Sequence, residues 1–247
     1  MMRPRIYNLV FVLSLFAFAV LTAGCPGIPT PACTLPIPPG PTVSTGGNPR
    51  GIAVAPNGEF VYVTNSDDNT VSQYSIDVCG GLVPLATPTV ATGGRPHGIA
   101  IVDFSSAAPA RYAYVTNRQS GTISQYSVSA TGELVPLSPP SISTASGPDA
   151  IAVIKRNVYV VNHDSAKVSQ YVIGAGGGLV PLSPATVSTG VQPSAIAINP
   201  TGQFAYVTNG LANTVSQFAI SPNAISPAPA STSGSTDSPP ANTSRPP

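Results

Sequence analysis

Four polar residues stand at the same place in a repeated phrase of the sequence, and their types together would suit a binding site. Each follows a proline and leads into a short apolar segment: Arg50, His97, Asp149 and Ser194. The flanking residues repeat while these four vary, a pattern typical of a repeated scaffold that presents a ligand site. A cation, an imidazole, a carboxylate and a hydroxyl favour a small polar or anionic ligand, with Arg50 and His97 as donors and Asp149 orienting a neighbour. The competing interpretation is that all four are ordinary polar loop tips.

Other catalytic and metal-binding motifs are absent from the sequence. It has no nucleophile elbow, no metal-spaced histidine pair and no phosphate loop, because the glycine run 176–178 stands where other repeats have a turn. The acidic segment 66–69 lacks the distal bidentate carboxylate of a calcium loop, so we interpret it as a solvated hairpin. We predict no metal and no cofactor, and His97 is the only candidate catalytic residue.

The composition indicates an apolar, weakly charged body with many turns. Of the 247 residues, 42% are hydrophobic and only 8% are charged. Without Arg3 and Arg5 at the start of the chain, eight basic residues stand against nine acidic ones, which leaves no basic stripe and argues against nucleic acid as a partner. The 29 prolines and 23 glycines favour turns over long helices.

A repeat with intervals of 52, 45 and 47 residues organises the chain. The phrase Tyr-Val-Thr-Asn, with Val for Thr in one copy, ends at Asn65, Asn117, Asn162 and Asn209. A second phrase, Val/Ile-Ser-Gln-Tyr/Phe, follows each copy, an alanine-containing apolar segment precedes it, and three copies end in Leu-Val-Pro-Leu. Short β-branched or aromatic phrases between turn residues predict a meander of strands.

Each unit is predicted to be one four-stranded blade of a β-propeller. Turns at 56–58 and 200–202 contain a glycine, which accepts the positive φ of a tight hairpin. The proline of the fourth phrase removes a ladder donor, so that strand is expected at a sheet edge. A solenoid, the main alternative, would need parallel strands and longer connections. The predicted fold is all-β: a β-propeller of four four-stranded blade repeats over residues 42–220, as a closed four-bladed or partial ring.

The repeated phrases resemble the YVTN repeat family and, more distantly, the seven-bladed lactonase-like propellers. The resemblance covers roughly residues 42–220 and implies about seven blades, whereas four copies are present. A compact four-bladed ring, an open partial ring and one part of an oligomeric ring therefore stay open. Residues 95–98 also resemble a proline-histidine motif of these propellers, in which a histidine lies near the active site. No glutamate partner for His97 is evident, because Glu59 and Glu133 occupy predicted turns.

The ends of the repeat region predict how a ring would close. Residues 42–47 copy residues 89–94, the tail of an outer strand, although no first three strands precede them. The fourth repeat has residues 224–227 in place of a good outer strand. An N-terminal strand that completes the last blade would remove an exposed sheet edge, and this is the predicted topology.

The first 24 residues resemble a bacterial lipoprotein signal peptide. A short basic start, an apolar run at 9–21 and the ending Ala23-Gly24-Cys25 are typical of secretion followed by lipid attachment to Cys25, although Thr22 replaces the usual Leu, Val or Ile. The alternative is an uncleaved membrane anchor over residues 6–23. Both predict a body at the bacterial cell envelope, outside the cytoplasm, either periplasmic or on the cell surface, with the membrane as a partner.

The segments that flank the repeats differ from them in composition. The proline-rich residues 25–41 are predicted to form a stiff tether, and the Ser-, Pro-, Ala- and Thr-rich residues 221–247 a disordered tail. Cys33 and Cys79 could pair in an oxidising envelope. They align at equivalent points of two different blades, which lie too far apart for a disulfide, so the alignment favours two separate thiols.

Three functions remain open on the sequence. The leading one is a membrane-tethered propeller that binds a protein or a small ligand without catalysis. The second, implied by the family resemblance and by His97, is a lactone hydrolase of the 6-phosphogluconolactonase-like kind. The third is a cell-surface structural or adhesive module.

Overall fold

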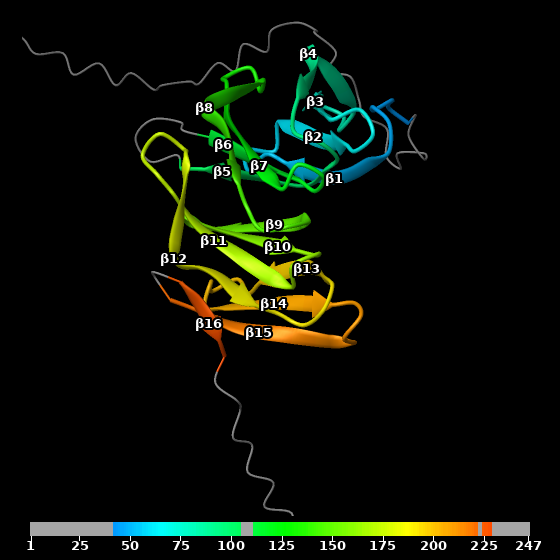
Figure 1. Cartoon of the computed structure of the whole chain (residues 1–247). Helices are drawn as coiled ribbons and strands as arrows, with labels where there is room; N and C mark the ends of the chain where they lie inside the picture. Colours follow the sequence, from blue (N-terminus) through cyan, green and yellow to red (C-terminus); the bar gives the residue numbers. More distant parts are fainter. Residues whose placement is uncertain (1–41, 105–110, 222–223, 229–247) are drawn as a thin grey trace, which may run out of the picture. The chain divides into compact units, whose positions relative to one another are not determined.

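The computed structural model describes residues 42–104, 111–221 and 224–228, and every regular element in them is a β-strand (Figure 1). The strands form four antiparallel four-stranded sheets, each ordered as its strands follow in the chain. The prediction of an all-β fold with four blade repeats is confirmed. The predicted signal peptide and tether lie outside the described residues, as does residue range 229–247. Within the part described, no helix is long and apolar enough to cross a membrane.

Each sheet corresponds to one repeat. The first blade consists of β1 (Pro49–Val54), β2 (Phe60–Asn65), β3 (Thr70–Ile76) and β4 (Leu82–Ala91). The second consists of β5 (Pro96–Asp103), β6 (Arg111–Asn117), β7 (Thr122–Val128) and β8 (Leu134–Ser143). The third consists of β9 (Pro148–Ile154), β10 (Asn157–Asn162), β11 (Lys167–Ile173) and β12 (Leu179–Ser188). The fourth consists of β13 (Pro193–Ile198), β14 (Phe204–Asn209), β15 (Thr214–Ile220) and β16 (Ile225–Pro227).

Prolines and glycines set the ends and edges of the strands as the sequence predicts. Gly58 and Gly202 turn the opening hairpins of the first and fourth blades with φ values of 73° and 71°. Pro84, Pro136 and Pro181 lie on β4, β8 and β12, which are edge strands of their sheets. An edge strand tolerates proline because one side of its backbone needs no ladder donor.

Neighbouring blades pack face to face. The first strands of successive blades are in contact, β1 with β5, β5 with β9 and β9 with β13. The buried Tyr62 donates its hydroxyl to the carbonyl of Gly132 in the next blade, at 2.7 Å. Gly132 has a φ of 90°, and a Cβ there would lie 2.3 Å from the ring of Phe60, so only glycine fits beneath that ring. The blades therefore interlock through backbone groups as well as apolar side chains.

The predicted closure by an N-terminal strand is wrong. The fourth blade takes its outer strand from β16, and residues 42–47 do not pair with it. They lie on the first blade, where Ser44 accepts the hydroxyl of Tyr74 at 2.6 Å and the amide of Gly46 donates to Asn65 Oδ1 at 3.1 Å. Residues 42–47 repeat the sequence of residues 89–94, which link the first blade to the second. The two segments also make the same contact, because Tyr126 donates to the carbonyl of Ala91 at 2.7 Å as Tyr74 does to that of Ser44.

Two further expectations are corrected. The strand β16 lies within residues 221–247, so the blades continue past Ile220, where the sequence analysis ended them. Cys79 is disulfide-bonded, so it is not a separate thiol, and the other two cysteines lie outside the described residues.

Candidate functional site

A bulge at the start of each blade sets the four predicted site residues apart from the sheet ladder. The pairing of the first strand with the second shifts directly after the proline in every blade. The residue before each proline has a positive φ, between 50° and 69°. Bulges redirect side chains, and many adjoin functional sites. The bulge recurs in all four blades, so each blade has one side chain directed out of the sheet ladder at this place. The type of that residue then decides which contacts the side chain can make.

His97 and Asp149 meet across the boundary between the second and third blades. His97 Nδ1 lies 2.8 Å from Asp149 Oδ1. The His97 side chain is only 11% exposed, and its Nε2 is buried without a hydrogen-bond partner in the described residues. An imidazole that donates from Nδ1 to a carboxylate keeps a lone pair on Nε2 when it is neutral. The pair can therefore present a proton acceptor whose orientation the carboxylate holds.

Threonines of the preceding blades hold these two residues in place. Thr64 donates its hydroxyl to the carbonyl of His97 at 2.7 Å, and Thr116 donates to that of Asp149 at 2.6 Å. Each threonine belongs to the repeated Tyr-Val-Thr-Asn phrase, so the phrase positions the site residue of the following blade.

Arg118 connects this pair to a second group of polar residues. Its Nη1 lies 3.7 Å from Asp149 Oδ2, and its Nη2 lies 3.1 Å from Asp164 Oδ1. The guanidinium is partly exposed and faces two carboxylates, which hold it at a defined place. We refer to His97, Asp149, Arg118, His163 and Asp164 together as the His97 cluster.

His163 makes two contacts that exclude one another. Its Nδ1 lies 2.9 Å from Arg118 Nη2 and 2.7 Å from Asp164 Oδ1. One ring nitrogen cannot accept from arginine and donate to a carboxylate at once, so the proton on Nδ1 selects the partner. The hydrogen bond from His163, assisted by the positive charge of Arg118, lowers the pKa of Asp164 below its ordinary value.

A pocket of about 310 Å³ opens at this cluster. Its lining residues are Arg95, Arg118, Gln119 and Asp164. Two guanidinium groups and an amide can bind a small anion or a polar ligand, while the carboxylate limits the net positive charge. In the described residues, no group of three His, Cys, Asp or Glu side chains could hold a metal ion.

Of the four residues singled out from the sequence, the structure brings together two. Arg50 is exposed and forms no ion pair with a described residue. Ser194 is also exposed, and its Oγ lies 3.1 Å from Thr208 Oγ1 in its own blade. His97 and Asp149 lie on the neighbouring strands β5 and β9, whereas the described first and fourth blades, which carry Arg50 and Ser194, share no strand contact comparable to that of β5 with β9. A binding role for the four residues stays a prediction.

Sequence reasoning missed Arg118, His163 and Asp164, although the repeat contained a signal for them. The residue after the repeated asparagine also varies: Ser66, Arg118, His163 and Gly210. The end of each second strand pairs with the start of the first strand, as Asn117 does with Pro96. Both variable positions therefore lie at the same end of each sheet, and alignment of the copies predicts that they adjoin.

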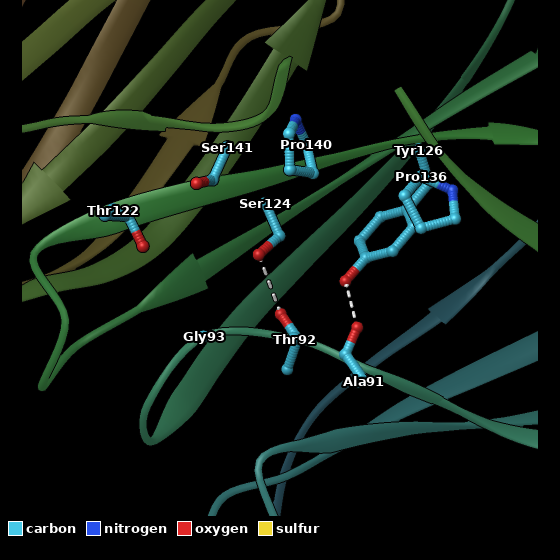
Figure 2. Close-up of a pocket in the computed structure, with 9 residues that line it drawn as sticks. All are labelled: Ala91, Thr92, Gly93, Thr122, Ser124, Tyr126, Pro136, Pro140 and Ser141. Carbon is cyan, nitrogen blue, oxygen red and sulfur yellow. Dashed lines mark hydrogen bonds between the residues drawn. The ribbon is translucent and has the colours of Figure 1, made fainter. Parts of the chain in front are cut away.

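Another pocket recurs in two blades and serves their packing. Figure 2 shows the copy in the second blade, about 240 Å³, where Tyr126 donates to Ala91 at 2.7 Å and Thr92 donates to Ser124 at 2.9 Å. A counterpart of about 180 Å³ adjoins Tyr74 in the first blade. These hydroxyls already bind the linker that enters the blade, so the pockets are a less favourable ligand site than the His97 cluster.

Comparison with known proteins agrees with this architecture. The sequence model of a family described as a lactonase with a seven-bladed β-propeller matches residues 102–240. That segment carries three of the four repeated asparagines and all of the His97 cluster except His97 itself. No curated protein matches the chain.

Solved structures with this fold carry different activities. A periplasmic gluconolactonase from Pseudomonas aeruginosa is similar with a TM-score of 0.62 and 20% identity, over 72% of this chain and 52% of that one. A protein from Lactobacillus plantarum has a TM-score of 0.65 and 17% identity, over 77% and 60%. Hydrazine synthase from Kuenenia stuttgartiensis has a TM-score of 0.54 and 18% identity, over 76% and 52%. The chain thus spans little more than half the length of these structures, and such identities establish the fold alone.

Proposed function

Because the chain belongs to the lactonase family of seven-bladed β-propellers, we propose that it hydrolyses a small polar lactone at the His97 cluster. The observation that carries this proposal is the hydrogen bond between His97 and Asp149, 2.8 Å long, combined with an unpartnered Nε2 on the same ring. The chain spans about half of its solved relatives, so their activity enters here as support for a proposal.

The chemistry needs one general base and one group that stabilises negative charge. His97 Nε2 is buried in the structure, so the proposal requires the pocket to open as far as this nitrogen. Nε2 then removes a proton from water while the water oxygen bonds to the lactone carbonyl carbon. The ring C–O bond then breaks, and the proton passes from the imidazolium to the departing ring oxygen. The products are one hydroxy acid and a regenerated His97. Asp149 orients the ring and stabilises the imidazolium while it exists.

Arg118 supplies the positive charge in this scheme. Its guanidinium lies beside Asp149 and lines the pocket, where it can bind the carbonyl oxygen as that oxygen becomes negative. The same group suits the carboxylate of the product. Asp164 keeps Arg118 in position through its Nη2.

Lactone hydrolysis is tested with the full chain and a panel of sugar lactones, gluconolactone included. His97→Gln and Asp149→Asn should each lower kcat/KM at least about 100-fold, the contribution expected of a general base. The matched control is Asp67→Asn, an acid-to-amide change in the corresponding turn of the first blade, and it should retain wild-type turnover. Equal activity of His97→Gln and wild type would exclude His97 as the base.

Binding without turnover is a second candidate function, and one observation favours it. The pocket is lined by Arg95, Arg118, Gln119 and Asp164, so a ligand there can contact Arg118 without reaching the buried His97 nitrogen. Calorimetry with gluconate distinguishes the two candidates. Binding that Arg118→Met abolishes, in a protein without lactone turnover, would support a binding module. Turnover that requires His97 would support the hydrolase.

We also propose that a lipid on Cys25 holds the body at the bacterial cell envelope. The support is the basic start, the apolar run and the Ala23-Gly24-Cys25 ending of the leader. A site on the extracytoplasmic side would then act on ligands outside the cytoplasm.

A further inference from the structure

The third and fourth blades border a second pocket, at the end of the strands opposite to the His97 cluster. Strand β9 separates the two places, because Asp149 stands near its start and Ile154 at its end. The volume of the pocket is about 550 Å³, within the range of about 300 to 1,000 Å³ that is usual for small-molecule sites. We propose that this pocket binds a small molecule in which one aromatic ring carries a carboxylate.

An aromatic ring fills the corresponding place between the other blades. In the first blade, Phe60 packs over Gly132 of the next blade, where an added Cβ would lie 2.3 Å from the ring. Tyr112 of the second blade packs over Gly177 in the same way, at 2.0 Å. The third blade has Asn157 at this position, five residues before the repeated asparagine. The side chain that the third blade turns to this place is therefore not a ring.

The turn that would receive such a ring also differs in the fourth blade. In the third blade, the amide of Gly174 donates to the carbonyl of Gly178, four residues on, at 2.8 Å. In the fourth blade, the amide of Ser221 donates to the carbonyl of Ala224, three residues on, at 2.9 Å. The sequence of residues 221–224 contains no glycine. The pocket lies where the ring and the glycine turn of the other blades meet, because Asn157 and Ser221 both line it.

A buried hydroxyl without an acceptor adjoins this pocket. Tyr159 is fully buried, and its hydroxyl has no hydrogen-bond partner in the described residues. The equivalent Tyr62 and Tyr114 donate to glycine carbonyls of the next blade. Burial raises the pKa of the Tyr159 hydroxyl, and the nearby Asn157 side chain opposes this rise only in part, so the hydroxyl remains a protonated donor. A buried donor without an acceptor costs free energy, which a ligand oxygen beside it would recover.

Two cations line the pocket, and no acidic side chain of the described residues lines it with them. Lys155 and Arg156 form the tight turn between β9 and β10, and neither makes an ion pair with a described residue. Arg156 Nε donates to the carbonyl of Ile173 at 2.9 Å, and the guanidinium carbon lies 5.0 Å from the centroid of the Phe104 ring. These contacts hold Arg156 in place while its charge stays available to an anion.

The three features together define the chemistry of the ligand. The space has the place of an aromatic ring in the other blades, and the apolar side chains of Ile154, Val172 and Ile220 suit the faces of a flat ring. A carboxylate on the ring can bind the two cations. A polar oxygen elsewhere on the ring can accept the buried tyrosine hydroxyl. This site is separate from the lactone site proposed at the His97 cluster.

The test measures the binding of 4-hydroxybenzoate to the full chain by calorimetry. This probe joins a phenol ring, like that of Tyr112, to a carboxylate. Wild type should bind one equivalent with a Kd below about 1 mM. Asn157→Phe and Asn157→Tyr should each abolish binding, because the new ring would occupy the pocket as Phe60 and Tyr112 occupy the corresponding places. Their Tm should match or exceed that of wild type, because the added ring is removed from water.

Changes of charge test the role of the two cations. Lys155→Met should weaken binding about 5-fold, the effect of one exposed ion pair. The neutral 4-hydroxybenzyl alcohol, which has the ring without the carboxylate, should bind at least about 10-fold more weakly than 4-hydroxybenzoate. Lys167→Met is the matched control: this lysine is exposed at the start of β11, away from the pocket, and its variant should bind like wild type.

A variant of the His97 cluster separates this site from the lactone site. Arg118→Met should leave the binding of 4-hydroxybenzoate unchanged, and Asn157→Phe should leave lactone turnover unchanged. Four results would each overturn the proposal: no binding by wild type at millimolar probe, binding that both Asn157 variants retain, equal binding of the neutral alcohol, or loss of binding in Arg118→Met.

Discussion

At the scale of single residues, the residues that repeat in every blade stabilise the fold, and the residues that could bind or react differ between the blades. The repeated asparagines stabilise the hairpin between the second and third strands of a blade. Asn117 Nδ2 donates to Thr122 Oγ1 at 3.0 Å and to Ser124 Oγ at 2.8 Å. The same pair of contacts recurs at Asn65 and Asn209. The groups available for chemistry lie at positions that differ between copies, as His97 and Arg118 do.

The asparagine contacts predict a loss of stability. Asn117→Ala should lower the free energy of unfolding by about 2 kcal/mol, because two buried hydrogen bonds contribute about 1 kcal/mol each. Asn57→Ala, in an exposed turn, should change it by less than about 0.5 kcal/mol. Urea unfolding measures the free energy of unfolding of both variants. Equal losses for Asn117→Ala and Asn57→Ala would contradict the role of Asn117 in stabilising the hairpin.

The lowered pKa of Asp164 predicts that the contribution of this residue to the stability of the fold depends on pH. A carboxyl whose pKa is lower in the folded state stabilises the fold above its unfolded-state pKa, and this contribution is lost as pH falls through its folded-state pKa. Asp164→Asn should therefore lower Tm at neutral pH and have a vanishing effect in acid. The side chain is 47% exposed, so the effect should stay below about 1 kcal/mol.

Thermal melts of wild type and Asp164→Asn, measured from neutral pH down into acid, provide the difference in Tm. High salt at neutral pH is the control, because it should reduce the difference by screening Arg118 from Asp164. A difference that grows as pH falls would contradict the assignment.

At the scale of elements, the second strands of the first and second blades bind the following blade through a tyrosine hydroxyl. Tyr62 and Tyr114 reach carbonyls of the next blade, and burial raises the pKa of both hydroxyls, so they remain protonated donors. The bulge after each proline is the other repeated feature, and it directs one side chain per blade out of the hydrogen-bond ladder between the first and second strands.

Loss of one inter-blade hydroxyl is expected to cost stability. Tyr114→Phe should lower the free energy of unfolding by about 1 to 2 kcal/mol, because it leaves the carbonyl of Gly177 without its donor. Tyr112→Phe is the control on the same strand, since no hydrogen bond of that hydroxyl is present in the described residues, and it should have less than half that effect. Similar losses for both variants would show that the inter-blade bond contributes little.

At the scale of the whole molecule, the proposed envelope location depends on the leader. Cys25→Ala should abolish incorporation of labelled fatty acid and release the body from the membrane fraction, because the thiol is the proposed attachment point. Cys33→Ala is the control and should still be labelled. Equal labelling of wild type and Cys25→Ala would refute the lipid anchor.

The sequence alone determined the features that depend on neighbours along the chain. Four copies of short β-branched phrases predict the strands, the glycines predict the tight turns, and the prolines predict which strands lie at the edges. The alignment of copies also predicts that His97 and Asp149 occupy equivalent positions. Each of these conclusions follows from residue type and spacing within one blade.

Only the tertiary structure decided the features that depend on how blades meet. The contact between His97 and Asp149, the place of Arg118 beside them, and the attachment of residues 42–47 to the first blade each join different repeats. Such distances follow from the rotation between neighbouring blades, which many small packing contacts set together. A repeated sequence offers the same partners in several blades, so local pattern cannot choose among them, and the packing does.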